Sequence, residues 1–158
     1  MNKSRIRNSI LIVALLIIIF SCDSNRVFEQ NIEIPDSYWN RDSVMYFSVD
    51  ITDTLLPHSI FINLRHESKY PKRNLYLFIN TYAPSGFAIR DTFEIILANE
   101  KGRWYGVGLG SVKDVQTAFK RNVRFPVSGT YRFEIEQAMR YDKLPNIRSI
   151  GLRIETIE

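Results

Sequence analysis

The chain has 158 residues, of which 45% are hydrophobic, and 21 basic side chains face 17 acidic ones. This length suits one domain with a single hydrophobic core, and a single cysteine excludes an intramolecular disulfide. Three of the basic residues stand in the first seven positions, so the formal net charge of +4 belongs mostly to the N-terminal segment and predicts no nucleic-acid partner.

The N-terminal segment has the residue order of a bacterial lipoprotein signal. Basic residues within positions 3–7 precede eleven consecutive apolar residues, 10–20, and the small Ser21 then precedes Cys22. Eleven residues of helix cover about half of a ~30 Å hydrocarbon core, so this run is too short for a transmembrane anchor. We therefore expect residues 1–21 to be removed as a signal peptide and Cys22 to carry the lipid that anchors the protein to a membrane.

Cleavage at this position leaves a mature chain of 137 residues with 18 basic and 17 acidic side chains. Its first residues, 22–30, are expected to form a lipidated tether. Residues 31–158 are expected to form a single domain without cysteine, which must rely on its hydrophobic core for stability. Ten Phe, eight Tyr and two Trp in the chain supply large side chains for that core.

Apolar and polar residues alternate with a period of two through most of the mature chain. Such alternation in short runs, separated by Gly, Pro and Asn turn residues, is typical of half-buried antiparallel strands. The expected strands cover residues 44–51, 59–66, 74–82, 91–98, 103–110, 130–139 and 149–157. Because no helices alternate with these strands, the pattern predicts an all-β fold: a single antiparallel β-sandwich, jelly-roll-like, with about seven or eight strands.

One segment, 111–121, departs from the period of two. It opens with Ser111, carries Asp114 three positions later, and ends in two basic residues, an order that fits a helix capping box and a favourable charge at the helix end. Its apolar residues fall at helical spacing. The segment therefore predicts one short helix packed on the sandwich, and the alternative is an irregular loop docked there.

Residue patterns for catalysis or metal binding are weak. His58 and His66 lack a nearby carboxylate or cysteine set and suit hydrogen-bonded or surface histidines better than metal ligands. Glu134 and Glu136 share a strand face, which a solvated outer surface explains. The glycine-rich stretch 106–110 lacks the Lys-Ser/Thr that follows a phosphate loop and suits a bulge. We therefore expect no enzyme activity, no metal, no cofactor and no small-molecule substrate.

Aromatic residues beside basic ones offer a binding surface for a protein partner. Segment 70–76 interleaves tyrosines with Lys and Arg, and Tyr, Trp and Arg are the residue types that most often dominate protein interfaces. We expect Arg73 and Tyr76 to bind a partner, with Trp104 and Tyr105 as a second candidate surface. The alternatives are that these aromatics stack on a glycan or that they belong to the core.

Several longer stretches of the mature chain are distinctive. They include "CDSNRVFEQ" (22–30), "FINLRHESKYPKRNLYLFI" (61–79), "DTFEIILANEKGRWYGVGLGSVKD" (91–114), "SGTYRFEIEQAMR" (128–140) and "IGLRIE" (150–155), and their most specific parts are Asn-Leu-Arg 63–65, Tyr-Pro 70–71, Gly-x-Trp 102–104 and Gln-Ala-Met-Arg 137–140. In this order they resemble the gliding-motility lipoprotein GldH family of Bacteroidota.

The resemblance implies an outer-membrane lipoprotein that is needed for gliding and tied to the type IX secretion apparatus. We expect it to lie on the periplasmic face of that membrane rather than on the cell surface. It implies other gliding and secretion proteins of the envelope as partners, and no catalytic residues. The alternative function is a glycan-binding lipoprotein of the cell envelope that uses exposed aromatic side chains.

Two short stretches, 42–44 and 53–55, look like the Asp-Ser/Thr-aliphatic O-glycosylation sites of Bacteroidota. Ser43 precedes an expected strand and Thr54 follows one. Both hydroxyls are therefore expected to be exposed, as acceptors of a glycan must be.

Overall fold

The computed structural model describes residues 25–157, so Cys22 and the expected signal peptide lie outside the described residues. The described chain is all-β. Its elements are, in order, β1 (Arg26–Glu33), η2 (Pro35–Ser37), β2 (Tyr38–Asn40), β3 (Met45–Ile51), β4 (His58–Glu67), β5 (Asn74–Tyr82), β6 (Ala88–Ile96), β7 (Val112–Val123), β8 (Gly129–Gln137), β9 (Lys143–Pro145) and β10 (Ile147–Thr156). Within residues 25–157, no helix has the length and apolar character to cross a membrane.

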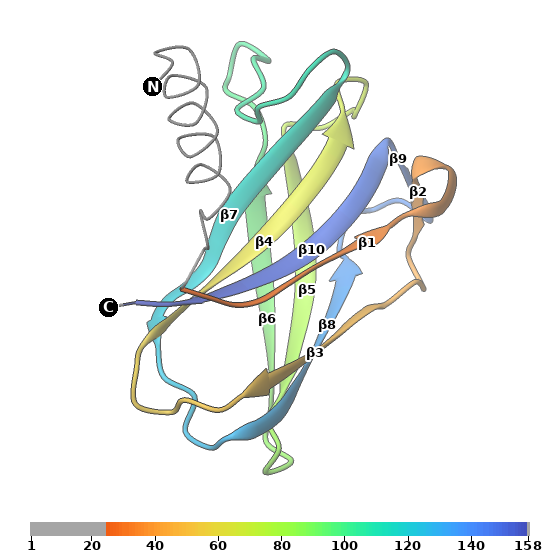
Figure 1. Ribbon diagram of the computed structural model, residues 1–158. Helices are drawn as coiled ribbons and strands as arrows, with labels where there is room; N and C mark the ends of the chain where they lie inside the picture. Colours follow the sequence, from red (N-terminus) through yellow and green to blue (C-terminus); the bar gives the residue numbers. More distant parts are fainter. Residues whose placement is uncertain (1–24, 158) are drawn as a thin grey trace, which may run out of the picture.

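Two four-stranded sheets pack face to face as a sandwich (Figure 1). One has the strand order β1-β10-β4-β7 and the other has the order β3-β8-β5-β6, while β2 and β9 form a separate two-stranded ribbon. All of these pairings are antiparallel. The expected antiparallel β-sandwich is therefore confirmed.

The core lies between the two sheets and consists of the alternate residues that the sequence pattern placed on one strand face. Ile62 and Leu64 of β4, Leu77 of β5 and Phe133 of β8 are all at most 2% exposed, whereas Arg65, the residue after Leu64, is exposed to solvent. Full burial of one such side chain stabilises the fold by about 1.5–3 kcal/mol. The period of two in the sequence therefore predicts both where these strands lie and which of their faces is buried.

Six of the seven expected strands are present, with ends displaced by at most three residues. The seventh, 103–110, is instead part of a long connection between β6 and β7 that makes only isolated bridges. The structure adds β1, in which residues 26–30 of the expected tether pair with β10. This ladder runs from Arg26 opposite Glu155 to Glu33 opposite Ser149.

The predicted helix over 111–121 is wrong, and so is the alternative of an irregular loop, because these residues form most of β7. Asp114, the expected partner of Ser111 in the capping box, accepts a hydrogen bond from Arg65 of the neighbouring β4 at 2.6 Å and forms an ion pair with it. Phe119 packs edge-on against Phe93 of the other sheet, with ring centres 5.2 Å apart. Pairing with β4 satisfies a full row of backbone groups, and this tertiary gain outweighs the local helical pattern.

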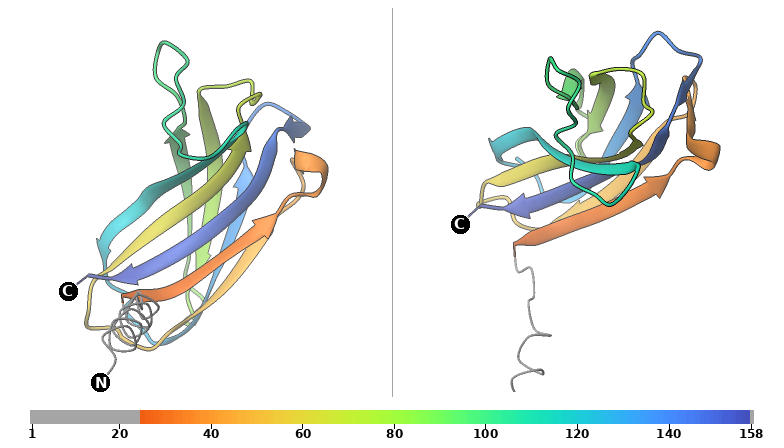
Figure 2. Two further views of the ribbon diagram at one scale, coloured as in Figure 1. Left: turned by 45° about the horizontal axis from the view of Figure 1, so that its top comes forward. Right: turned by 90° about the horizontal axis from the view of Figure 1, so that it is seen from above.

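The connections between strands gather at two opposite ends of the sandwich (Figure 2). We call them the N-terminal end, which holds residues 52–57, 83–87 and 124–128, and the far end, which holds residues 68–73, 97–111 and 138–146. The start of β1 belongs to the N-terminal end, because the N–H of Thr156 donates to the carbonyl oxygen of Asn25 at 2.8 Å. Beside it, Ile157 N–H donates to the Pro57 carbonyl oxygen at 2.8 Å.

Candidate functional site

Two segments that the sequence singled out for partner binding, 70–76 and 104–105, are joined at the far end. The N–H of Leu97 donates to the carbonyl oxygen of Arg73 at 2.7 Å, and the N–H of Tyr105 donates to the carbonyl oxygen of Leu97 at 2.9 Å. The side chains of Arg73 and Tyr105 are both exposed. The backbone therefore joins, at the far end, two segments that are far apart in sequence and that each carry an exposed side chain.

Tyr76 lies nearby on the outer face of β5 and is 38% exposed. It lines a shallow, largely apolar hollow of about 680 Å³ together with Lys72, Met139 and Tyr141. The Lys72 ammonium group lies 5.9 Å from the centre of the Tyr141 ring, and a hydrogen bond to Glu94 raises the pKa of Tyr76. The hollow offers a side chain of a partner both an apolar floor and a positive charge at its rim.

Trp104 and Tyr70 support this surface and do not form it. Trp104 is half-buried, with its ring centre 4.7 Å from the ring centre of His66. Tyr70 is 3% exposed, and its hydroxyl donates to the carbonyl oxygen of Asn74 at 3.0 Å. Both aromatics hold far-end connections onto the core, so of the sequence-predicted residues Arg73, Tyr76 and Tyr105 are the ones available to a partner.

The connection between β6 and β7 carries three apolar side chains in a row that point to solvent. Tyr105, Val107 and Leu109 are 61%, 75% and 97% exposed. We call these three residues the apolar tip. The exposure of Val107 and Leu109 does not follow from their alternation with glycines, which fits a strand as well as a loop. The glycines themselves are the signal that this stretch does not pair in a sheet.

The glycines give the apolar tip a defined shape. Val107 exchanges two backbone hydrogen bonds with Asp114, at 3.0 and 2.7 Å, so the connection folds back along the start of β7. Gly108 has a φ of 152°, and a Cβ atom there would overlap the carbonyl oxygen of Val112. A side chain at position 108 would therefore push the connection off β7.

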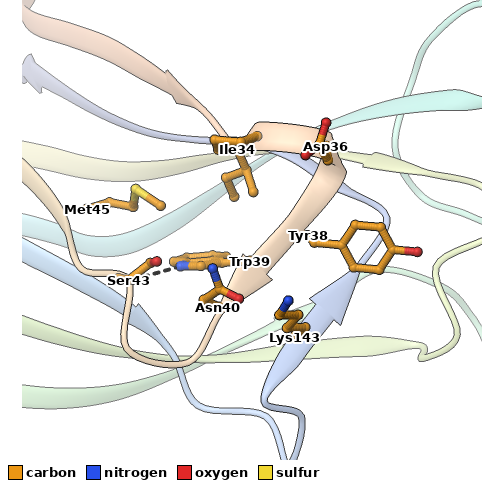
Figure 3. Close-up of a pocket in the computed structure, with 9 residues that line it drawn as sticks. Ile34, Asp36, Tyr38, Trp39, Asn40, Ser43, Met45 and Lys143 are labelled. Carbon is orange, nitrogen blue, oxygen red and sulfur yellow. Dashed lines mark hydrogen bonds between the residues drawn. The ribbon is translucent and has the colours of Figure 1, made fainter.

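A second hollow, of about 360 Å³, lies at the corner between β1 and β2 (Figure 3). Trp39 forms part of its wall but is fully buried, and its Nε1 donates to the carbonyl oxygen of Ser43 at 2.9 Å. Tyr38 at the rim is 53% exposed. Trp39 thus belongs to the core, and Ser43, expected as a glycan acceptor, is half-buried at the edge of this hollow.

Thr54, the other expected acceptor, lies in the connection between β3 and β4 and is half-exposed. The carboxylate of Asp53 accepts hydrogen bonds from the N–H groups of Leu55 at 2.7 Å and Leu56 at 3.0 Å. These bonds lower the pKa of Asp53. Thr54 is therefore held in a tight turn built by the side chain of its neighbour.

The two histidines lie at opposite ends of β4 and are both buried, at 1% and 0% exposure. His58 packs against Phe125, with ring centres 5.1 Å apart, and Nδ1 of His66 lies 2.9 Å from the carbonyl oxygen of Glu67. Eight residues of strand separate the two imidazoles by about 26 Å, so they cannot share a metal ion. Among the described residues, no group of three or more His, Cys, Asp or Glu side chains could hold a metal.

Glu134 and Glu136 lie on the outer face of β8, each against an arginine. Glu136 pairs with Arg90 at 3.2 Å and Glu134 pairs with Arg132 at 3.1 Å. Asn80 also donates to Glu136 at 3.1 Å. The two carboxylates thus take part in cross-strand and same-strand polar contacts rather than facing one another across a cleft.

The buried histidines predict a fold that acid destabilises. Burial lowers the pKa of both His58 and His66 below 6.5, so the unfolded chain takes up protons first as the pH falls. Their contribution to stability is therefore present above about pH 6.5 and is lost as the pH falls through the lowered pKa values of the folded state. We expect the urea midpoint to fall between pH 7 and pH 5, and to fall less in His66→Phe; an equal fall in that variant would contradict the assignment.

Comparisons with known proteins agree with one another. The sequence model of the GldH lipoprotein family matches residues 26–154. The gliding motility lipoprotein GldH of Flavobacterium johnsoniae is 35% identical over 96% of this chain and 98% of its own length. A gliding motility lipoprotein GldH homolog of Christiangramia forsetii is 36% identical over 93% of this chain and 94% of its own length.

Among solved structures, the family GH115 4-O-methyl-α-glucuronidase BtGH115A matches 87% of this chain and 18% of its own chain. The TM-score is 0.45 and the sequence identity is 9%. This likeness is too weak to bear on fold or activity.

Proposed function

The chain belongs to the GldH lipoprotein family, and from that premise we propose that it is a lipid-anchored component of the gliding-motility apparatus. Cys22 carries the lipid, and the domain lies on the periplasmic face of the outer membrane. The protein works by binding other envelope proteins of gliding and type IX secretion, without catalysis and without a cofactor. Support comes from the relatives, both of which are named for gliding motility.

The observation that carries the binding role is the apolar tip. Val107 and Leu109 are 75% and 97% exposed although the core between the sheets is filled without them. Exposed apolar side chains that gather in one place mark interaction sites, and Tyr and Arg are enriched where interfaces gain most of their binding energy. The apolar tip next to Arg73 is therefore the surface that a protein partner would bury.

The side chains that catalysis would need are engaged in structural contacts. His58 and His66 are buried against aromatic rings and carry lowered pKa values. The carboxylates of Glu134 and Glu136 pair with arginines. A general base or nucleophile must reach its substrate, whereas both histidines are closed off from solvent and both carboxylates are paired with arginines. This arrangement supports a binding role.

Changing the apolar tip tests the proposal. The triple variant Tyr105→Ser, Val107→Ser and Leu109→Ser should lose at least about tenfold in recovery of gliding or secretion proteins from detergent-solubilised membranes, because it removes the apolar contact of an interface centre. The melting temperature should stay at the wild-type value. Quantitative mass spectrometry of the captured proteins measures the loss.

A matched control changes an exposed aromatic elsewhere. Tyr46, 57% exposed on β3, is outside the far end, so Tyr46→Ser should leave partner recovery unchanged. Equal recovery by wild type and triple variant would contradict the proposed surface. Binding of the wild type to insoluble polysaccharide, lost in Tyr46→Ser but kept in the triple variant, would favour the glycan-binding alternative.

A further inference from the structure

The N-terminal end carries a second group of exposed apolar side chains, separate from the apolar tip. They come from three different connections of the sandwich and are Leu55 (81% exposed), Leu56 (40%), Phe87 (63%) and Val127 (41%). We call these four residues the basal patch. Large apolar side chains that are exposed together at one end of a domain mark an interaction site.

Contacts between the three connections hold the basal patch together. The Nε of Arg124 donates to the carbonyl oxygen of Leu55 at 3.1 Å, which joins the first connection to the third. Gly129 lies so close to Pro84 that an added Cβ would come within 2.9 Å of the proline ring, which joins the second to the third. An apolar hollow of about 250 Å³ lined by Phe87 and Arg124 among others continues the patch into the sandwich.

The charged groups around the basal patch leave an excess of positive charge. Arg121 and Arg124 are exposed beside it. Among the nearby acidic groups, Asp91 pairs with Lys120 at 2.7 Å, whereas Asp53 stays charged while it accepts two backbone hydrogen bonds, so the two arginines outnumber this one unpaired carboxylate. An apolar patch flanked by arginines is complementary to an anionic phospholipid surface, which attracts basic residues close to it.

The length of chain before β1 limits how far this end can lie from a lipid anchor. The carbonyl oxygen of Asn25 is hydrogen-bonded to Thr156, so the chain is fixed to the sandwich from that residue on. Three residue steps separate Asn25 from Cys22, and three steps span at most about 11 Å. A lipid on Cys22 therefore holds the N-terminal end, and with it the basal patch, against the bilayer.

We propose that the basal patch is a membrane-contact surface: Leu55, Leu56, Phe87 and Val127 enter the headgroup region of an anionic phospholipid bilayer, and Arg121 and Arg124 contact the lipid phosphates. This rests on the lipid attachment at Cys22 in the proposed function. Acyl chains alone leave a domain free to rotate about its attachment point, whereas insertion of the patch fixes its orientation. The far end, with the apolar tip, then points away from the bilayer.

The single cysteine of the chain makes this orientation measurable. Lipid attachment consumes the thiol of Cys22, so the wild-type lipoprotein should not react with a thiol-specific fluorophore. Leu55→Cys and Phe87→Cys each add one reactive thiol in the basal patch, and Leu109→Cys adds one at the far end as the matched control. Each full-length variant is labelled and reconstituted into vesicles of phosphatidylethanolamine and phosphatidylglycerol that contain nitroxide-labelled lipid.

We expect the nitroxide lipid to quench probes at positions 55 and 87 at least about threefold more than the probe at 109, because only the basal patch reaches the headgroups. Equal quenching at the three positions would overturn the membrane contact. A probe at 55 that is already shielded in detergent without vesicles would instead show that protein, a second copy included, covers the patch, and would overturn it too. Labelling of the wild type would show that Cys22 is free, and so would count against the proposed anchor rather than against the patch.

Discussion

Cys22→Ser should abolish incorporation of labelled palmitate, leave an unprocessed or mislocalised precursor and stop gliding. Serine lacks the thiol that accepts the lipid, and the chain has no second cysteine to replace it. Metabolic palmitate labelling followed by fractionation and a motility assay measures all three effects.

The control for this variant is the preceding residue. Ser21→Ala keeps a small side chain at the expected cleavage position, so processing, palmitate labelling and gliding should remain at wild-type levels. Normal labelling of Cys22→Ser would disprove the lipid attachment site. Loss of labelling with intact gliding would show that the anchor is not needed for the motility role.

Trp39→Ala should lower the free energy of unfolding by about 3–5 kcal/mol, because it deletes a fully buried aromatic side chain and leaves a cavity. The variant also loses the hydrogen bond that Nε1 of Trp39 donates to the carbonyl oxygen of Ser43. Urea denaturation followed by circular dichroism, on residues 25–158 made without the signal segment, measures the change. Trp39→Phe should restore part of the loss because it refills part of the cavity.

The second tryptophan of the chain provides the comparison. Trp104 is half-buried at the far end, so Trp104→Ala removes less area from the core and should cost about 1–2 kcal/mol. A larger loss for Trp104→Ala than for Trp39→Ala would contradict the burial pattern. Because Trp104 directly precedes Tyr105 and packs on His66 of the core, its loss should loosen the start of the apolar tip and also weaken partner recovery.

The strands were predictable wherever one face of a strand meets the core and the other meets water. In β3, for example, Phe47, Val49 and Ile51 are buried and the residues between them are exposed, and this is the alternation seen in the sequence. The edge strand β1 was missed because it reads "RVFEQNIE" and buries little of its surface. The strand β7 was misread because its apolar residues also suit a helix, and only pairing with β4 decides between the two.

The types of residue in the candidate site could be predicted from the sequence, but which individual residues are exposed there could not. Arg73, Tyr76 and Tyr105 are exposed as an interface requires, whereas Tyr70 and Trp104, of the same residue types, are packed on the core. Which tyrosine faces solvent depends on the neighbours that the sheet pairing brings, and a local pattern does not contain them. The backbone hydrogen bonds that link Arg73 to Tyr105 through Leu97 likewise depend on the tertiary fold and not on a local pattern.

The antiparallel pairing of β1 with β10 has a mechanical consequence for a protein of a motility apparatus. With the lipid proposed for Cys22 before β1 and the proposed partner bound at the far end, the lipid would pull the start of β1 toward the membrane and the partner would pull the rest of the sandwich the opposite way. Both forces act along the strand axes, so they load the hydrogen bonds between β1 and β10 in shear. The whole ladder from Arg26 to Glu33, with the ion pair between Arg153 and Glu29, then resists traction together instead of peeling apart one bond at a time.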